Sequence, residues 1–432
     1  MHNLAGSSED HEAMWLHGVR CAVEQHESVR GSIEIAGGRI ICIHDGATPV
    51  ATTSKAMEID LSGFLVMPGL INAHDHLQFA LYPKLGNPPY RNYIEWGEDI
   101  HATFPEVIAK YKSVPKDVRL WWGGIRNLLC GVTTVCHHDP LWPELQRNDF
   151  PVRVVQRYGW AHSQKLGGDL RKAHSDTPDG SAFIVHSSEG VDDLARQEVF
   201  GLDRLGVMDA STVLVHGLSL DEAGVALVEE RKASLIVCPS SNQFLFGRPP
   251  DMELLGSIEK ITLGNDSPLT ALGDFLDEIR FAIECGIAPH RAYRMVTKAS
   301  ATILRLKDGE GALRIFGLAD LIAVQDTGDD AAERLRTLSM ADIELVIVRG
   351  QVQLASEAVW KLLPLEIRRS LEPLWIEGGV RWLRAPVDQL LRKTEAVLGR
   401  SEIRLGGKLV CHPEMARDGV VRSGDGSSAI MH

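Results

Sequence analysis

Histidine and acidic side chains stand at the ends of several apolar, strand-like runs of this sequence. Six residues share this placement or follow it closely: His74, His76, His186, Glu189, His216 and Asp266. His74 and His76 follow the run FLVMPGLINA, and residues i and i+2 of a strand point to the same face. Two imidazoles can therefore converge on one cation. Because a His or an Asp recurs at four strand ends, a shared site is favoured over a chance distribution.

This set of side chains is suited to holding a divalent metal. Neutral imidazole nitrogens and a carboxylate fit Zn²⁺ or Fe²⁺, and we expect one ion per chain, with Zn²⁺ preferred. Such a metal lowers the pKa of a bound water toward about 7 and so provides hydroxide at neutral pH. A nearby carboxylate such as Glu189 can then move protons between that water and the leaving group. The seven cysteines include no CxxC pair, which argues against a thiolate site.

The elements that must position these residues alternate between strand and helix. VLVHGLSL is typical of a buried strand, and the following DEAGVALVEERKA has apolar residues at helical spacing. Similar strands are GVTTVCHH, VRVVQRYGW, AFIVHSSEG, SLIVCPSSN and KITLGNDSP. These repeated units predict an α/β domain with a parallel sheet or barrel over residues 67–310. In such a barrel the chemistry lies at the carboxyl ends of the strands.

The regions on either side of the barrel have a β-rich texture. Residues 14–66 alternate apolar and polar positions around a Gly-Gly turn, and residues 311–355 contain β segments bounded by glycine and aspartate. We expect the two regions to pair into one sheet assembly. Residues 356–432 are predicted to be a helical extension that ends in a disordered tail.

The composition favours a small-molecule ligand. The chain is 44% hydrophobic and 24% charged, as expected of a soluble globular protein. Its net charge of −13 offers no basic surface for nucleic acid and no obvious pocket for a phosphorylated substrate, so a neutral ligand is expected. The opening MHNLAGSSEDHEAM contains no long apolar run, which predicts a cytoplasmic protein without a membrane partner. A homo-oligomer is compatible with these features.

The sequence resembles the amidohydrolase superfamily, in the branch that contains guanine and cytosine deaminases and triazine chlorohydrolases. The resemblance covers residues 15–355. It rests on motifs that occur in the family's order: MPGLINAHDHL, GVTTV, FIVHSSEG, VLVHG, CPSSNQFLFG, LGNDSP, VTKASATIL and GLADLIAV.

The resemblance implies a distorted (β/α)8 barrel beside a β-sandwich made from both chain ends. By the resemblance, the metal ligands are His74, His76, His186 and Asp266. It further implies that His216 contacts the reactive water, that Glu189 is the proton shuttle, and that Asp266 also takes part in catalysis. No lysine is suitably placed to bridge two metals, since Lys165, the nearest candidate, lies in a Gly-rich loop. Only a short segment separates VRVVQRYGW from AFIVHSSEG, so one barrel strand is expected to be missing or vestigial.

Further residues are candidates for the wall of a substrate pocket, which requires aromatic surfaces and a few fixed polar groups. Gln78, Tyr82 and Trp96 follow the histidine pair, and His137 ends the GVTTV strand. His138, Asn242 and Arg248 are additional candidates.

The leading hypothesis for the function is hydrolytic deamination of an aminated nitrogen heterocycle, with Glu189 protonating a ring nitrogen before ammonia leaves. An alternative keeps the site but hydrolyses a cyclic amide, a carbamate-like group or an aryl halide, and the fold alone does not choose between them. A third possibility is a noncatalytic binding module on the same barrel. The presence of all six residues favours an enzyme.

Overall fold

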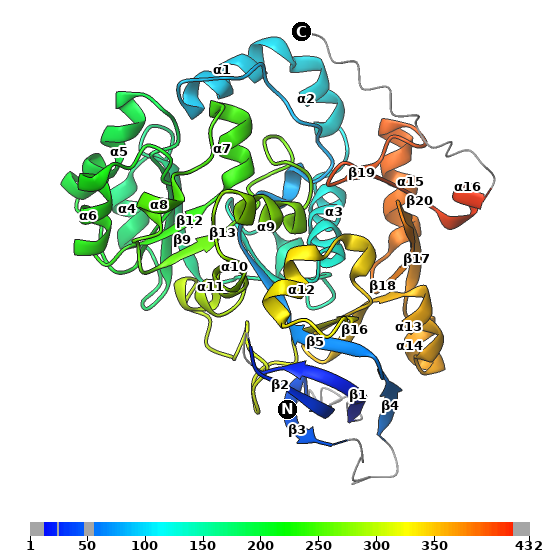
Figure 1. The fold of residues 1–432 in the computed structure, drawn as a ribbon. Coiled ribbons are helices and arrows are strands. Elements are labelled where there is room, and N and C mark those ends of the chain that lie inside the picture. Colours follow the sequence, from blue (N-terminus) through cyan, green and yellow to red (C-terminus); the bar gives the residue numbers. More distant parts are fainter. Residues whose placement is uncertain (1–12, 24–25, 47–55, 418–432) are drawn as a thin grey trace, which may run out of the picture.

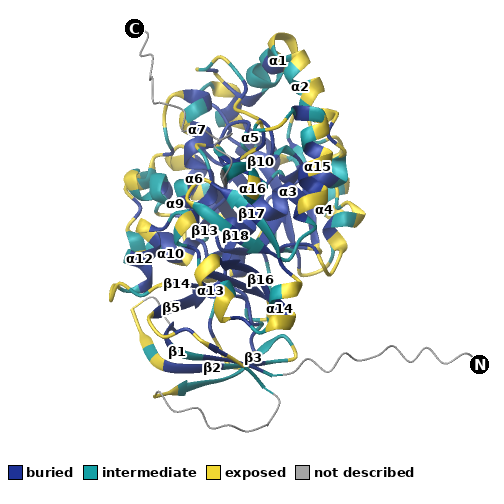
Figure 2. Cartoon of the chain, turned by 90° about the vertical axis from the view of Figure 1, so that its right-hand side faces the viewer, coloured by how far each residue is buried: buried dark blue, intermediate teal, exposed yellow. Residues whose placement is uncertain are grey.

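The computed structural model describes residues 13–23, 26–46 and 56–417 of the chain. Figure 1 shows a central α/β body, a β-rich module at the foot of the view, and the C-terminal strands and helices along one side. Buried residues fill the centre of the molecule, whereas the exposed ones lie on the outer faces of the helices and in loops (Figure 2). None of the described helices combines the length and the apolar character needed to cross a membrane.

The central body contains two groups of parallel strands. One group pairs in the order β6-β7-β8 and the other in the order β13-β12-β11-β10-β9. A single parallel bridge between Asp75 and Asp266 connects the region of β6 with the loop after β13. The strands are β6 Leu70–Asp75, β7 Val132–His137, β8 Arg153–Val154, β9 Tyr158–Ser163, β10 Ala182–Ser187, β11 Thr212–His216, β12 Ser234–Val237 and β13 Ile261–Leu263.

The third unit of this body is shortened, in the region where the sequence analysis expects a vestigial strand. β8 has two residues, and β9 begins after only three more, without a helix between them. β9 and β10 are then joined through the six-residue helix α4. The pocket wall next to β9 is therefore built from loops rather than from a full βα unit.

Helices and short 3-10 turns follow the strands and cover the outside of the barrel. Several begin at an aspartate whose side chain accepts backbone N–H bonds, as at Asp192 before α5, Asp221 before α6 and Asp274 before α9. The helical elements are η1 Leu77–Phe79, α1 Tyr93–Thr103, α2 Pro105–Lys112, α3 Lys116–Leu129, η2 Pro143–Gln146, α4 Leu170–Ser175, α5 Asp193–Arg204, α6 Glu222–Glu230, α7 Pro239–Phe246, α8 Met252–Leu255, α9 Phe275–Glu284, α10 Pro289–Met295, α11 Lys298–Ile303 and α12 Ala331–Thr337.

The two ends of the chain contribute strands to one mixed sheet. β5 pairs antiparallel with β14, which brings residues 64–68 beside residues 321–325. A tight turn at Gly37 and Gly38, both with positive φ, joins β2 to β3 as the Gly-Gly pattern indicates. The strands are β1 Met14–Ala22, β2 Ser28–Ala36, β3 Arg39–Asp45, β4 Met57–Asp60, β5 Phe64–Pro68, β14 Leu321–Gln325, β15 Leu345–Val348 and β16 Gln351–Ser356, with η3 at Met340–Asp342.

The C-terminal extension is not purely helical, so that prediction was wrong in part. Its strands extend the same sheet beyond β16, in the order β16-β18-β17-β20-β19. The predicted disordered tail falls on residues 418–432, which lie outside the described residues. The elements of the extension are α13 Glu357–Leu362, α14 Leu365–Arg369, β17 Glu372–Ile376, β18 Gly379–Leu383, α15 Val387–Leu398, β19 Arg404–Leu405, β20 Lys408–Cys411 and α16 Pro413–Arg417.

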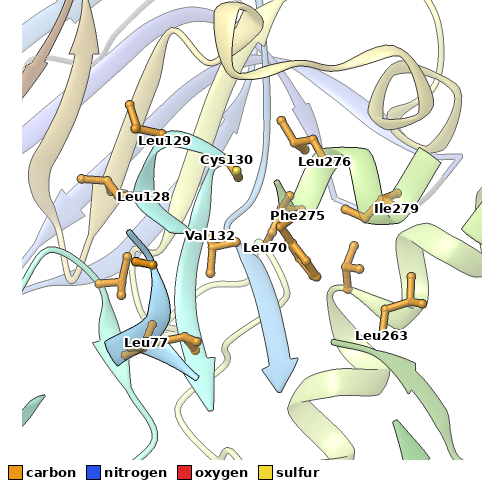
Figure 3. Close-up of a cluster of buried hydrophobic side chains, with 14 of the residues drawn as sticks. Leu70, Leu77, Leu128, Leu129, Cys130, Val132, Leu263, Phe275, Leu276 and Ile279 are labelled. Atoms are coloured by element: carbon orange, nitrogen blue, oxygen red, sulfur yellow. The ribbon is translucent and has the colours of Figure 1, made fainter. Parts of the chain in front are cut away.

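The largest hydrophobic core lies between the barrel strands and the helices outside them. Figure 3 shows Leu70 of β6 and Val132 of β7 facing Phe275 and Leu276 of α9, with Cys130 close to them. The same core continues into the extension, because Leu390 and Leu391 of α15 belong to it. α15 also contacts α3, where Trp122 Nε1 donates to Thr394 Oγ1 at 2.8 Å.

We predict that Thr394→Val destabilises the protein although Thr394 is far from the strand ends. The change keeps the volume but leaves the buried Trp122 N–H without an acceptor, a cost of about 1–3 kcal/mol in the free energy of unfolding. Urea unfolding measures this change. The neighbouring Lys393→Ala variant is the control, because its 3.7 Å pair with Asp117 is exposed and should contribute less than about 0.5 kcal/mol. Equal stability of both variants would contradict an integral role for α15.

Candidate metal centre and active site

The end of β6 directs two histidines to one side and an aspartate to the other. His74 and His76 lie on the inner side, while Asp75 between them is fully buried against α3. Arg126 Nη2 donates to Asp75 Oδ2 at 2.6 Å, and Asn127 Nδ2 donates to the same oxygen at 2.8 Å. The alternation of a strand therefore separates the two imidazoles from the ion pair behind them.

Four predicted residues converge above the strands. The potential ligand atoms of His74, His76, His186 and Asp266 all lie within 4.8 Å of one another. His74 Nε2 is 3.2 Å from His186 Nε2 and 3.5 Å from Asp266 Oδ1, and His76 Nε2 is 3.6 Å from the same carboxylate oxygen. The fold brings these four residues together from three separate strand ends.

Hydrogen bonds behind these residues fix which atoms face the centre. His186 Nδ1 donates to the carbonyl oxygen of His162 at 2.7 Å, so Nε2 keeps its free lone pair. His76 Nδ1 lies 3.3 Å from Asp139 Oδ2, which directs its Nε2 inward in the same way. Ser241 Oγ and Thr270 Oγ1 both donate to Asp266 Oδ2, at 2.7 and 2.8 Å, and this leaves Oδ1 for the histidines.

Three of the four residues have charge states that suit a cation, whereas burial alone would lower the pKa of His76 but its bond with Asp139 outweighs burial and raises that pKa. Burial lowers the pKa of His74 to about 4 and that of His186 well below its ordinary value, so both imidazoles are neutral near pH 7. Burial alone would raise the pKa of Asp266, but the bond with His74 and the neighbouring imidazoles outweigh it and keep the carboxylate ionised. Neutral nitrogens beside an ionised carboxylate fit Zn²⁺ or a similar divalent metal.

Glu189 and His216 lie together beside this group. Glu189 Oε1 is 3.5 Å from His216 Nε2, and His216 Nδ1 donates to Asn242 Oδ1 at 2.9 Å. Burial raises the pKa of Glu189 well above its usual value, and the nearby charges of Asp266 and Glu198 add to this effect. A carboxyl group that holds a proton near neutral pH can act as a general acid.

The backbone at these strand ends is held in an uncommon conformation. Ser188, His216 and Asp266 have φ values of 58°, 79° and 59°, in the left-handed region that non-glycine residues seldom adopt. Glu198 supports the first of these turns, because its Oε2 accepts the Ser188 N–H at 2.8 Å and its Oε1 accepts the Tyr93 hydroxyl at 2.9 Å. Tyr93 is the first residue of α1, so this carboxylate links the active-site turn to a helix above it.

A cavity of about 840 Å³ opens over the metal-ligand group. Its walls include the predicted residues Gln78, Tyr82 and Trp96, together with His76, His186, Glu189, His216 and Asp266. Trp96 is fixed by its Nε1 donating to the carbonyl oxygen of Leu85 at 2.9 Å. The 3-10 turn η1 and the helices α1 and α2 supply the apolar part of the wall, and Figure 1 shows α1 and α2 lying across the top of the molecule.

The placement of His137 in the pocket was wrong. Its Nδ1 accepts the backbone N–H of Leu77 at 3.3 Å, and the side chain is buried and absent from the cavity lining. The adjacent His138 faces the centre instead, with its ring 4.3 Å from that of His186. Arg248 is exposed and does not line the cavity either, whereas Asn242 holds His216.

The sequence analysis missed His162, which lines the cavity and packs 4.9 Å from the ring of His186. The sequence contains the same signal for His162 as for His186, because His162 follows the apolar run YGWA and His186 follows the apolar run FIV. It also missed the cationic residues Lys112, Lys116 and Arg119, which lie on helices rather than at strand ends.

Sequence comparisons relate the chain to hydrolases. Residues 172–353 match the model of the amidohydrolase family. A 5-methylthioadenosine/S-adenosylhomocysteine deaminase of Pelotomaculum thermopropionicum is 28% identical over 393 residues, which cover 77% of this chain and 90% of the relative. A similarly named deaminase of Natronomonas pharaonis is 25% identical over 404 residues, covering 78% of this chain and 90% of the relative.

Solved structures share the fold. A triazine hydrolase variant superposes with a TM-score of 0.67 at 16% identity, covering 89% of this chain and 99% of the other. A zinc-bound adenosine deaminase from Xanthomonas campestris gives a TM-score of 0.63 at 18% identity, covering 89% and 97% of the two chains. The expected α/β class is confirmed by this shared fold, and strands of both chain ends lie in one mixed sheet where a β-sandwich was expected. The chain is thus similar to the amidohydrolase family over residues 172–353, and it shares the fold of these solved structures.

Proposed function

We propose that this protein is a metal-dependent deaminase that hydrolyses the exocyclic C–N bond of an aminated nitrogen heterocycle. The observation that carries this proposal is the position of the Glu189 carboxyl group beside both His216 and the four-residue metal-ligand group. Curated relatives that this chain matches over 90% of their length are deaminases by name. We assign one ion to the site, held by His74, His76, His186 and Asp266, with Zn²⁺ as the preferred metal.

The reaction consumes one water and releases ammonia, leaving an oxo group on the ring carbon. A divalent metal at these four residues, when bound, lowers the pKa of water and so makes a nucleophile available near pH 7. Glu189 is placed to accept protons from the attacking water and to donate them, first to a ring nitrogen and then to the departing amine. His216, held through Nδ1 by Asn242, presents Nε2 to the same space and orients the reacting water.

The pocket offers mainly apolar surfaces to the flat ring of a substrate. Phe79, Tyr82 and Trp96 provide aromatic surface on one side of the cavity. Gln78 adds a polar side chain, although its Nε2 already donates to Asp139. Stacking of a heteroaromatic ring against such surfaces supplies binding free energy without requiring further charges.

We predict that the purified protein carries about one divalent metal ion per chain. His186→Asn should lower this content to near zero, because the shorter side chain no longer presents Nε2 to the other ligands. His101→Asn is the matched control, since His101 lines the same cavity but is exposed on α1 and outside the four-residue group. Elemental analysis without added metal measures both variants. A metal-free parent whose activity ignores chelators would contradict the site, and two ions per chain would contradict the single-metal assignment.

Glu189→Gln should retain the metal and lose most of the activity. The amide keeps the shape of the side chain but cannot transfer a proton, and such groups contribute about 10² to 10⁴ in rate. The measurement is kcat for ammonia release alongside metal content. Turnover at the parental rate would show that Glu189 is not the proton shuttle, whereas loss of the metal would show that it supports the ligands instead.

The metal-loaded protein should release ammonia from at least one member of a panel of aminopurines, aminopyrimidines and aminotriazines. A coupled assay follows ammonia, and mass spectrometry identifies the oxo product. Matched cyclic amides, carbamates and chlorotriazines test hydrolysis of the other bonds at the same site. Turnover confined to those compounds would reject deamination and support the alternative, and inertness toward all of them would favour a binding module.

A further inference from the structure

One wall of the active-site cavity is cationic, although the chain as a whole has a net charge of −13. Lys112 at the end of α2 and Lys116 and Arg119 in the first turns of α3 all line this cavity. Figure 1 shows that α2 runs across the top of the molecule and leads into α3. Three cationic side chains from one short stretch of the chain therefore line this pocket.

These three cations are not neutralised by the carboxylates of the described residues, because no salt bridge within 4 Å is formed by any of them there. Arg119 donates through Nε and Nη1 to the carbonyl oxygens of Val114 and Gln78, at 3.0 Å each, and both acceptors are uncharged. Lys116 Nζ lies over the ring of Trp142, 3.6 Å from its centroid.

The carboxylate whose charge acts most strongly on Lys116 is Asp139, and it is already engaged. Asp139 Oδ2 is bonded to both His76 and Gln78. The other acidic residue at the mouth is Glu98, which is exposed on α1, while Glu189 and Asp266 belong to the catalytic group. The cavity lining thus holds as many acidic as cationic residues, but its cations all come from residues 112–119 and two of its carboxylates belong to the catalytic group.

Partial burial raises the free-energy cost of keeping Arg119 and Lys116 charged in the absence of a ligand. Arg119 is 7% exposed, and burial lowers the pKa of both Arg119 and Lys116. Cations held partly out of water interact more strongly with an incoming anion than fully solvated ones do. An anionic ligand group in this part of the cavity would offset the lost hydration.

We propose that the substrate is an aminated heterocycle that carries an anionic substituent, a carboxylate or a phosphate, bound by Lys112 and Lys116 with Arg119 behind them. This inference rests on the proposed deaminase function and specifies its substrate class. The cavity of about 840 Å³ has room for the ring near Glu189, the substituent at the lysines, and apolar contact with Trp96 and Ile108 between them. It replaces the neutral ligand expected from the whole-chain charge.

The test measures binding to the metal-loaded Glu189→Gln variant, which separates affinity from turnover. Probes are neutral and anionic pairs with the same ring: adenosine, cytidine and guanosine, each with its 5′-monophosphate and its 5′-carboxylic acid. Isothermal titration calorimetry should show at least one anionic member binding about tenfold or more tightly than its neutral partner. The preference for phosphate or for carboxylate identifies the source of the anion.

The lysine variants decide whether these residues cause the preference. Lys112→Gln combined with Lys116→Gln should remove it and leave the affinity for the neutral partner unchanged, and high salt should weaken only the anionic ligand. Lys110→Gln is the matched control, because Lys110 is an exposed lysine of α2 that does not line the cavity. An anionic preference that survives the double change, or an equal loss for both partners, would overturn the inference.

Ammonia release from the parent protein separates this inference from the proposed function. Release from neutral amines without any anionic preference would overturn the inference and leave the deaminase proposal intact. Lysine-dependent binding of anions without ammonia from any amine would overturn the deaminase proposal and, with it, the assignment of these anions as substrates. Absence of binding by every pair would overturn the inference outright.

Discussion

Asp75 lies between the two histidines of β6 and is completely buried, so its charge must be paired inside the protein. Arg126 and Asn127 of α3 provide the partners, and Asn72 Nδ2 adds a bond at 3.1 Å. Asn72 Oδ1 in turn accepts the backbone N–H of Asn265, next to Asp266, at 3.1 Å. One polar network therefore connects β6, α3 and the loop after β13. Loss of any partner would leave a buried charge uncompensated, which is far more costly than loss of an exposed pair.

The ligand atoms depend on this network and on a layer of hydrogen bonds behind them. His76, His186, His216 and Asp266 each use one polar atom for a fixed protein partner and present the other to the centre. The strained backbone at Ser188, His216 and Asp266 persists because these bonds determine it from several sides. The same hydrogen bonds hold the imidazole and carboxylate groups close together before any ligand binds. Such preorganisation is what a hydrolytic site requires.

The strand-end residues could be predicted from the sequence because a single local signal, an apolar run that stops at a polar residue, places them on the same rim. That signal does not fix the phase of a strand. In the GVTTVCHH segment two histidines stand side by side, and alternation sends His138 to the centre and His137 toward η1. The prediction of a helical C-terminal extension was wrong for a related reason. EPLWIEGGVRWL has leucine and arginine at spacings that also suit a helix, but Gly378 and Gly379 allow the hairpin between β17 and β18.

The net charge of the whole chain is a poor predictor of the charges that line one site. Most acidic side chains lie on the outside, where water screens them, whereas Lys116 is half-buried and Arg119 is buried in the lining of a cavity. Lys112, at the end of α2, and Lys116 and Arg119, on α3, lie outside the motifs on which the resemblance to the family rests. Tyr93 and Glu198 link α1 to the turn that carries Glu189. In the proposed assignment, changes in the α1 to α3 segment would alter which substrate enters while the strand ends keep the hydrolytic group unchanged, so ligand choice and bond cleavage would be encoded in different parts of the chain.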